Sequence, residues 1–410
     1  MTDAATAARY NVRPLLPGPE SVLRDAVLRL GLPTDRLSAL ATHGSVEALA
    51  VQGLAPDQAR ILERVLRERG GIVLTDVDGV HALLLAPLMA MADLPAALAA
   101  WSESAQSLGA AIGDVLMAHS ARPPPLRAGA HTFDFRTRTL VMGVINVTPD
   151  SFAGDSIDGD VAAVVERVRG FAHSGVDIVD IGGESTRPNS QPISAGEELD
   201  RVLPALRAVC AAVDVAVSID TRKSEVARRA IAEGAVIVND VWGLRGDPAM
   251  VDVIAQNPHV GLIAMHNQHG TAYGDLMEDI CISLRQSIRI AEASGVSADR
   301  VVVDPGFGFG KTPAQNLELM RRLGELRGLG RPILLGVSRK STIGLVGGGA
   351  GPSNRVEGTL ALIALGIAAG VSMVRVHDVA QAVRAVRTAD AVVRGTPPGV
   401  EALPPPGPTG

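Results

Sequence analysis

The sequence of 410 residues contains few aromatic residues and only two cysteines. Aromatic residues make up 2% of the chain, so a buried core must consist of Ala, Val, Leu and Ile. Cys210 and Cys281 each lie in an apolar pattern of helical type, which predicts two buried thiols. A disulfide framework is therefore excluded, and the low cysteine content indicates a protein of the reducing cytoplasm.

The sequence also lacks an excess of positive charge. Its formal net charge of −6 gives no support for a nucleic-acid partner. Residues 1–16 lack a basic segment followed by an apolar one, so no signal peptide is predicted. Apolar runs such as residues 358–370 are too short to span a bilayer. We therefore expect neither a nucleic-acid partner nor membrane association, and an anionic substrate would need locally concentrated positive charge.

A proline-rich segment, "ARPPPLRAG" at 121–129, is the predicted linker between two domains. Residues 1–125 before it read as a small α+β domain, and the Pro/Gly-rich residues 395–410 as a disordered tail. The α+β prediction rests on helical patterns at 19–31, 57–71 and 94–118, and on strand patterns at 72–77 and 81–88, joined by the hairpin signal Asp78-Gly79.

Residues 130–394 form the larger predicted domain, in which short apolar runs alternate with amphipathic segments. The strand candidates are 140–146, 177–183, 215–220, 235–240, 260–266, 301–306, 332–338 and 373–378. The helix candidates are 160–173, 195–212, 223–233, 248–256, 276–294, 313–327, 354–369 and 380–394. Such alternation indicates parallel βα units, and this number of units predicts a (β/α)₈ TIM barrel, an α/β fold.

Every predicted barrel strand ends in a hydrogen-bonding or charged side chain. These side chains are Asn146, Glu184, Asp220, Asn239, His266, Asp304, Ser338-Arg339-Lys340, Arg375 and His377. Active sites of such barrels lie at the carboxyl ends of the strands. The pattern therefore predicts one site at the mouth of the barrel.

The acceptors among these groups suit a flat nitrogen heterocycle. Asp220, Asn239 and Asp304 are expected on one side of the mouth, where carboxylates accept parallel N–H bonds from such a ring. Asp304 also has a plainer interpretation, since it could simply cap the turn before Pro305. The acceptors alone thus favour a heterocycle without proving one.

The basic side chains are expected on the opposite side of the mouth. Lys340, Arg375 and His377 would supply positive charge there, and the planar fork of arginine suits phosphate. Asn146 is a candidate ligand of Mg²⁺, which uses few protein oxygens and bridges phosphates. His377 could instead be a structural histidine bonded to backbone. Together the two sides predict a nitrogen heterocycle that carries a phosphorylated arm.

Seven motifs in this region, in the same order, resemble those of dihydropteroate synthase. They are "NVTPDSF" (146–152), "GGESTRP" (182–188), "SIDTRK" (218–223), "NDVWG" (239–243), "DPGFGFGKT" (304–312), "GVSRKS" (336–341) and "RVHDV" (375–379). The resemblance covers about residues 139–393. It implies condensation of 6-hydroxymethyl-7,8-dihydropterin diphosphate with 4-aminobenzoate, giving dihydropteroate and diphosphate in folate biosynthesis. It also implies a homodimer and sensitivity to sulfonamides, which mimic 4-aminobenzoate.

The resemblance assigns roles to individual residues. The pterin would be held by Asp220, Asn239, Asp304 and Lys340; the diphosphate by Arg375, His377 and, through Mg²⁺, Asn146; and the aminobenzoate by Phe152, Thr186, Arg187, Pro188, Phe309 and Ser341. Loops 146–160 and 184–194 would close over the second substrate and exclude water. The chain departs from the family pattern at Asp155, where the acid comes late, and at Asn189, where Gly is usual.

Two apparent motifs are rejected. "GFGFGKT" (306–312) looks like a phosphate-binding Walker A loop, but that motif requires glycine where this chain has Pro305. His266, His269 and Cys281 do not have the spacing of zinc ligands. Neither NTP hydrolysis nor a zinc site is expected.

Two alternative functions stay open at this point. A pterin-dependent methyltransferase shares the barrel and the pterin-facing acids, but does not require the motifs "NVTPDSF", "SRKS" and "RVHD". A catalytically inactive pterin-binding scaffold would be favoured if Lys340, Arg375 or His377 were absent. For residues 1–125 no cluster of catalytic groups is evident, so a packing or interaction role is the preferred interpretation.

Overall fold

The computed structural model describes residues 11–15, 46–147, 160–184 and 191–395, and these form two compact units. The first unit holds the described residues up to Pro123 together with Ala272–Arg285 and Arg321–Arg331. The second unit holds the remaining described residues.

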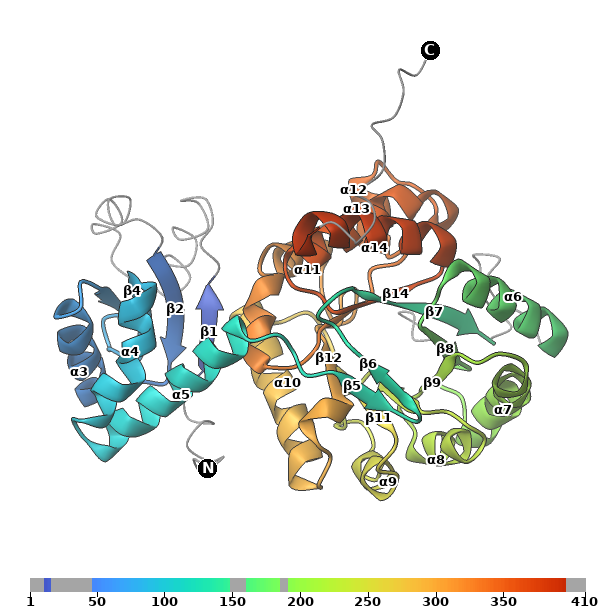
Figure 1. Ribbon diagram of the computed structural model, residues 1–410, viewed down its shortest axis with the longest axis horizontal. Coiled ribbons are helices and arrows are strands. Elements are labelled where there is room, and N and C mark those ends of the chain that lie inside the picture. Colours follow the sequence, from blue (N-terminus) through green and yellow to red (C-terminus); the bar gives the residue numbers. More distant parts are fainter. Residues whose placement is uncertain (1–10, 16–45, 148–159, 185–190, 396–410) are drawn as a thin grey trace, which may run out of the picture. The chain divides into compact units, whose positions relative to one another are not determined.

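The first unit contains an antiparallel sheet and helices, as the sequence predicted (Figure 1). The strands run in the order β1-β2-β4-β3 and are β1 (Asn11–Leu15), β2 (Val46–Gln52), β3 (Ile72–Thr75) and β4 (His81–Pro87). The helices are α3 (Pro56–Arg67), α4 (Leu88–Ala99) and α5 (Glu103–Ser120). The predicted hairpin is present between β3 and β4, and Gly79 in its turn has a φ of 68°, which glycine adopts without strain.

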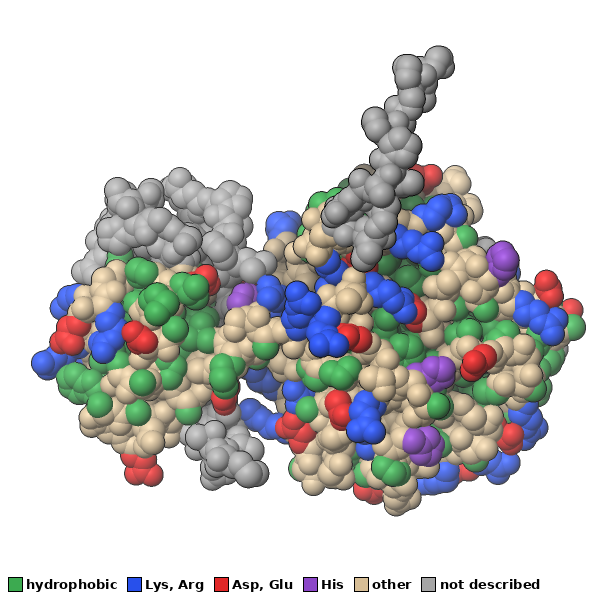
Figure 2. All heavy atoms as spheres, viewed as in Figure 1, with side chains coloured by type: hydrophobic (Ala, Val, Ile, Leu, Met, Phe, Trp, Pro, Cys, Tyr) green, Lys and Arg blue, Asp and Glu red, His purple; other side chains and the backbone are tan. Residues whose placement is uncertain are grey.

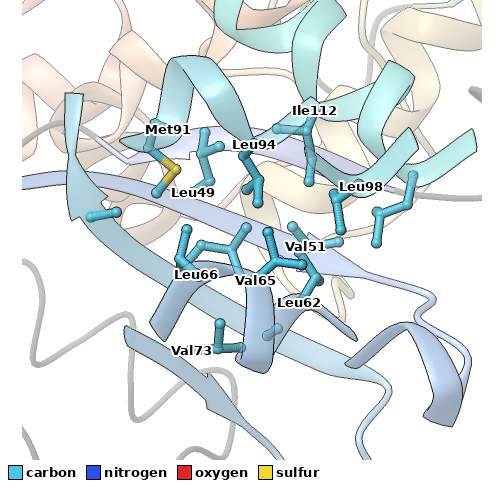
Figure 3. Packing of buried hydrophobic residues seen from close by; sticks show 14 of the residues in the cluster. Leu49, Val51, Leu62, Val65, Leu66, Val73, Met91, Leu94, Leu98 and Ile112 are labelled. Carbon is cyan, nitrogen blue, oxygen red and sulfur yellow. The ribbon is translucent and has the colours of Figure 1, made fainter. Parts of the chain in front are cut away.

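The core of the first unit consists almost entirely of aliphatic side chains, as expected from the scarcity of aromatic residues. Figure 3 shows side chains from the sheet and from the helices gathered in one cluster, which includes Leu62, Leu66, Leu94 and Leu98. All four side chains are fully buried.

Two expectations for the first unit are wrong. The long helix predicted over 94–118 is two helices, because Ser102 interrupts it: its Oγ accepts from the backbone N–H of Ala105 at 3.2 Å and caps α5. Strand β2 was not predicted, since its alanine- and leucine-rich sequence "VEALAVQ" has no alternation of polar and apolar residues. The helix predicted at 19–31 lies outside the described residues.

The second unit is a TIM barrel, which confirms the predicted α/β fold (Figure 1). Its parallel strands are β7 (Leu140–Asn146), β8 (Ile178–Gly182), β9 (Ala216–Asp220), β10 (Ile237–Asp240), β11 (Gly261–Met265), β12 (Val301–Asp304), β13 (Leu334–Leu335) and β14 (Met373–Val376). The sheet order is β12-β11-β10-β9-β8-β7-β14-β13, and a bridge between Val303 and Ile333 brings its two edges together.

Helices surround these strands and lie between them in sequence. They are α6 (Val161–Ser174), α7 (Ala195–Ala212), α8 (Ser224–Ala232), α9 (Met250–Gln256), α10 (Leu276–Ala293), α11 (Pro313–Arg321), α12 (Ser341–Val346), α13 (Val356–Ala368) and α14 (Val379–Arg394), with short 3-10 helices at Ala298–Arg300, Leu323–Leu329 and Pro352–Asn354. The helix predicted over 313–327 therefore ends at Arg321. None of the helices in the described residues is long and apolar enough to cross a membrane.

A short hairpin of β5 (Leu126–Ala128) and β6 (His131–Phe133) packs into the apolar interior of the barrel. The same cluster contains Ile178, Ile237 and Val302, which are the first or second residues of three barrel strands. Side chains of a strand alternate between its two faces, so residues two positions further along point the same way. A second interior layer thus follows at the carboxyl side, and it is largely polar: Asp180, Ser218, Asn239, Asp304 and Arg375.

Candidate active site

Three members of the polar interior layer, Asp180, Asn239 and Arg375, are joined by side-chain hydrogen bonds. Arg375 donates from Nε to Asp180 Oδ2 and from Nη2 to Asp220 Oδ2, each at 2.6 Å. Asn239 donates from Nδ2 to the same Oδ2 of Asp180 at 3.0 Å. Three strands, β8, β9 and β14, therefore meet through one guanidinium.

This arrangement corrects one expectation. The sequence predicted acidic and basic groups on opposite sides of the mouth, but Arg375 lies directly against two carboxylates. The reason is strand order: β14 lies beside β7, and β7 lies beside β8, so the short barrel circumference brings these groups together.

Burial shifts the protonation of two acids at the strand ends, Asp220 and Asp304. It raises the pKa of Asp220 to about 7, although the positive charge of Arg375 acts in the opposite direction. It also raises the pKa of Asp304 to about 6, against the bond from Gly306 and the charge of Lys340. For Arg375, burial alone would lower the pKa, but the attraction of Asp180 and Asp220 outweighs it, so the pKa is raised. The guanidinium therefore stays charged.

Asp304 forms the turn of its plainer interpretation, and its role as an acceptor for a heterocycle stays a prediction. Its Oδ1 accepts from the backbone N–H of Gly306 at 2.7 Å. Oδ2 lies 3.8 Å from the position that a Cβ on Gly336 would take, so it lies beside a residue without a side chain. The turn uses one oxygen and leaves the other directed at the interior.

Lys340 and Phe309 are brought together as a pair. The Lys340 ammonium lies 4.0 Å from the centroid of the Phe309 ring, a cation–π contact. The buried Asn316 links the two loops that carry them: it accepts from the Gly308 N–H at 2.8 Å and donates to Thr342 Oγ1 at 3.0 Å. Helix α12 begins at Ser341, as predicted.

His377 contacts the Ser338 hydroxyl with both its backbone and its ring. The Ser338 hydroxyl accepts from the backbone N–H of His377 at 3.1 Å and lies 2.9 Å from its Nδ1. The Ser338 hydroxyl can donate its own proton to Nδ1 or accept one from it, so this contact fits either tautomer of the neutral imidazole. The ring is thus oriented by its neighbour, whichever role it has.

Some predicted strand-end groups have structural partners instead. Glu184 forms ion pairs with Arg222 at 3.1 Å and with Lys223 at 2.8 Å. Arg339 has a φ of 57° and pairs with Asp378. These contacts fix the loops at the mouth of the barrel.

Sequence reasoning missed two buried residues of this region. Asp180 was passed over because it lies in the middle of an apolar strand rather than at its end. Lys311 was dismissed with the Walker-like motif, yet its ammonium lies 3.0 Å from His266 Nδ1 and donates to the Gly306 and Phe309 carbonyls at 3.0 and 3.1 Å. Burial lowers the pKa of Lys311 to about 7 and lowers that of His266 strongly. In each case the signal that could have found the residue is a charged side chain inside an apolar or glycine-rich run.

Part of the predicted aminobenzoate site lies outside the described residues. This applies to Phe152, Thr186, Arg187 and Pro188, and to the variant loop positions Asp155 and Asn189. For these residues the sequence-based assignments stay predictions.

The described residues contain no group of three or more His, Cys, Asp or Glu side chains that could hold a metal ion. Asn146, at the carboxyl end of β7, offers a single amide oxygen on the interior face of the barrel. One hard oxygen ligand suits a Mg²⁺ ion that takes its remaining ligands from phosphate and water. A single oxygen ligand does not suit a metal ion whose ligands all come from the protein.

A TIM barrel with two buried carboxylates, a buried amide and a lysine at its carboxyl mouth defines a class of enzyme. The pterin binding enzyme family matches residues 142–377. The match covers more than half of the chain, so the chain belongs to this family.

Its relatives within the family are dihydropteroate synthases. That of Clostridium beijerinckii is 43% identical over 270 residues, which cover 66% of this chain and 100% of the relative. That of Bacillus subtilis is 42% identical over 263 residues, which cover 63% of this chain and 90% of the relative.

Solved structures of dihydropteroate synthases are also similar. That from Clostridium difficile, in the presence of pteroic acid, has a TM-score of 0.62 and 46% identity, covering 64% of this chain and 99% of that one. That from Xanthomonas albilineans, with 4-aminobenzoic acid, has a TM-score of 0.62 and 38% identity, covering 69% and 100%. In both comparisons the matched part of this chain is about as long as the predicted barrel domain.

Proposed function

We propose that this chain is a dihydropteroate synthase, a transferase of folate biosynthesis that joins 6-hydroxymethyl-7,8-dihydropterin diphosphate to 4-aminobenzoate. The observation that carries the proposal is the set of Asp220, Asn239 and Asp304 on the interior of the barrel, next to Lys340; Asn239 and Asp304 are buried, and the Asp220 side chain is 12% exposed. This set fits a ring with several N–H donors, because buried acceptors gain most from charge-assisted bonds.

The pterin ring lies among these acceptors. Asp304 keeps Oδ1 on the Gly306 N–H and offers Oδ2 to ring N–H donors. Asn239 and Asp220 bond to the ring from neighbouring strands, β10 and β9. Lys340 and Phe309 border the ring on the side of the loops that follow β12 and β13.

The reaction breaks the bond between the pterin methylene carbon and the diphosphate oxygen. The electron pair leaves with the diphosphate, and the dihydropterin stabilises the cationic methylene. The amine of 4-aminobenzoate then forms the new C–N bond and loses a proton. This amine is already neutral at pH 7, so no strong general base is needed.

Negative charge grows on the departing diphosphate. His377, which directly follows β14, can donate a hydrogen bond to the leaving group, and Arg375 contributes positive charge at the border of the pterin site. A group aimed at developing charge typically lowers the barrier by about 3 kcal/mol. Asn146 would hold a Mg²⁺ ion, which neutralises charge on the diphosphate when bound.

The 4-aminobenzoate binds at the outer part of the mouth. Its carboxylate is placed at the start of α12, where Ser341 and backbone N–H groups face an anion, and its ring is placed near Phe309. Phe152, Thr186, Arg187 and Pro188 complete this site. Sulfonamides bind there in place of the aminobenzoate.

The active protein is a cytoplasmic homodimer in this proposal. Helices α13 and α14 pack against each other, yet Leu365 on α13 and Val392 on α14 expose 61% and 81% of their surface. A second copy that covers these side chains would remove apolar surface from water. The face drawn in Figure 2 shows basic and acidic side chains of the barrel interspersed with one another.

The presence of all the cationic groups disfavours the two alternatives. A pterin-dependent methyltransferase has no diphosphate to release, and therefore no need for Arg375, His377 and Lys340 together. An inactive scaffold would not need a histidine oriented by Ser338.

The test is diphosphate release from the dihydropterin diphosphate, measured with Mg²⁺ in the presence and absence of 4-aminobenzoate. Release that depends on the amine supports the proposal, and sulfonamides should compete with 4-aminobenzoate but not with the pterin. Equal release without the amine, or no release with metal present, would contradict it.

A further inference from the structure

Asp180 connects Asn239 and Arg375, two residues of its own interior layer that the proposed function places at the pterin site. It is the third residue of β8, its side chain is fully buried, and its Oδ2 accepts from both Asn239 and Arg375. We propose that Asp180 is a positioning residue that sets which end of the Asn239 amide faces the pterin and holds the Arg375 guanidinium in place. This inference rests on the proposed function.

The bond to Asp180 decides the orientation of the amide. A carboxylate oxygen can only accept, so the group of Asn239 that lies 3.0 Å from it must be the –NH₂. The amide oxygen is thereby directed elsewhere, as an acceptor for a ring N–H. Without this bond, the amide could rotate by half a turn at little cost and present a donor to a donor.

The same oxygen also fixes the guanidinium. Arg375 uses Nε for Asp180 and Nη2 for Asp220, so its plane is defined by two bonds to two strands. Asp220 alone would leave the group free to rotate about a single contact. Because both donors share Oδ2 of Asp180, the positions of Asn239 and Arg375 depend on each other.

The stability of the barrel alone gives little reason for this carboxylate. Its neighbours on β8 are apolar, and a buried ion pair is often no more stabilising than an apolar side chain of similar volume. The other carboxylate oxygen, Oδ1, has no hydrogen-bond partner within the described residues, which adds a further cost of burial. Setting the geometry of the pterin site explains why a carboxylate is present here.

The experiment compares substitutions at Asp180 with a control on the neighbouring strand. Asp180→Ala removes the shared acceptor. Asp180→Asn keeps it, because its amide oxygen can occupy the position of Oδ2. Ser218→Ala is the matched control: Ser218 is the register partner of Asp180, is equally buried, and bonds to neither Asn239 nor Arg375.

Binding of 6-hydroxymethylpterin is measured by calorimetry, and the KM of each substrate by diphosphate release. We expect Asp180→Ala to weaken pterin binding about a hundredfold, Asp180→Asn by about tenfold or less, and Ser218→Ala not measurably. The KM for 4-aminobenzoate should stay near that of the wild type in all three. Equal losses in Asp180→Ala and Ser218→Ala, or equal rises in both KM values, would overturn the inference.

A double-mutant cycle with Asn239→Ala separates positioning from a general structural role. If Asp180 acts through Asn239, Asp180→Ala should cost about tenfold less in the Asn239→Ala background than in the wild type. Strictly additive losses would contradict positioning of the amide. A wild-type chain that binds the pterin but releases no diphosphate would contradict the proposed function alone. The role of Asp180 would still be tested, because pterin binding by its variants can be measured without catalysis.

Discussion

Each of the two units buries an amide side chain, and the partners of the two amides differ. In the first unit, Gln58 accepts from the Ala55 N–H at 2.9 Å and donates to the Ser104 carbonyl at 2.8 Å, so both ends satisfy backbone at helix starts. In the barrel, Asn239 donates to the Asp180 side chain. In the proposed function its amide oxygen accepts from the ligand. The comparison contrasts an amide that satisfies two backbone groups with an amide whose orientation is set by a neighbouring carboxylate.

The hydrophobic cores of the two units also differ in whether they contain polar side chains. The first unit has one continuous aliphatic cluster, whereas the barrel has an apolar layer at the start of its strands and a polar layer two residues further along. The apolar layers supply stability through burial. The polar layer costs stability, because buried charges need partners, and this cost is typical of functional sites.

The largest expected effect follows from removing the guanidinium that joins the polar layer. Arg375→Ala leaves Asp180 and Asp220 facing each other in a buried position without a counter-ion. We expect kcat/KM to fall by about a thousandfold or more, together with a loss of roughly 3–5 kcal/mol in stability.

Arg375→Lys separates these two consequences. It keeps the charge but cannot bond to both carboxylates through one planar group. We expect most of the stability to return while kcat/KM stays well below that of the wild type. Full recovery of kcat/KM in this variant would show that the two-strand contact is not needed.

The next effect concerns Asp304, whose two oxygens have different tasks. Asp304→Asn preserves the turn, because an amide oxygen can still accept from the Gly306 N–H. The other position then carries –NH₂ instead of an acceptor. Pterin affinity should fall about a hundredfold, whereas the melting temperature should be no lower than that of the wild type, because the amide carries no charge in this buried position. Calorimetry and thermal unfolding of this variant decide it, and unchanged affinity would reduce Asp304 to a turn residue.

A smaller effect should appear in the pH dependence of pterin binding. Asp304 has a pKa of about 6 in the folded chain, and its ionised form is the acceptor. Asp220, with a pKa of about 7, is the second acidic acceptor, so affinity should be constant well above pH 7 and fall as the pH drops through both pKa values, by up to about tenfold per unit for each group. Calorimetry between pH 5 and 8 tests this. The acidic decline should be weaker in Asp304→Asn, and an identical decline in that variant would assign it to another group.

The free energy of unfolding should fall as the pH rises, whereas pterin affinity should rise. The folded pKa of Asp304 lies above the unfolded value of 3.8, so its contribution is most favourable below pH 4 and is lost as the pH rises towards 6. The loss amounts to roughly 3 kcal/mol for a shift of this size. Asp304→Asn removes this dependence, so the stabilities of variant and wild type should differ most above pH 6.

Much of the barrel and its site could be predicted from the sequence because both depend on local patterns. The βα alternation located each barrel strand to within a few residues, and the mouth residues followed from where apolar runs stop. Pairing across the barrel could not be predicted in this way. The contact of Arg375 with Asp180 joins residues 195 positions apart and depends on the order in which the strands close. The break at Ser102 was missed for a simpler reason, since one capping hydroxyl outweighed a continuous helical pattern.

The smallest expected effect on the site comes from a substitution in the first unit, and it tests directly whether the aliphatic core there serves stability alone. Leu94 is fully buried in the aliphatic cluster of the first unit, where it packs with side chains of α3, α5 and the sheet. Leu94→Ala removes buried apolar surface and leaves a cavity, which typically costs about 2–5 kcal/mol. If the first unit contributes packing alone, this loss should appear as a lower denaturation midpoint, with kcat and both KM values unchanged under conditions where the chain is folded. Chemical denaturation and the diphosphate assay on the same variant measure the two quantities. A change in pterin KM without loss of folded protein would mean that the aliphatic unit influences the polar layer, and the division between stability and function would then not follow the two cores.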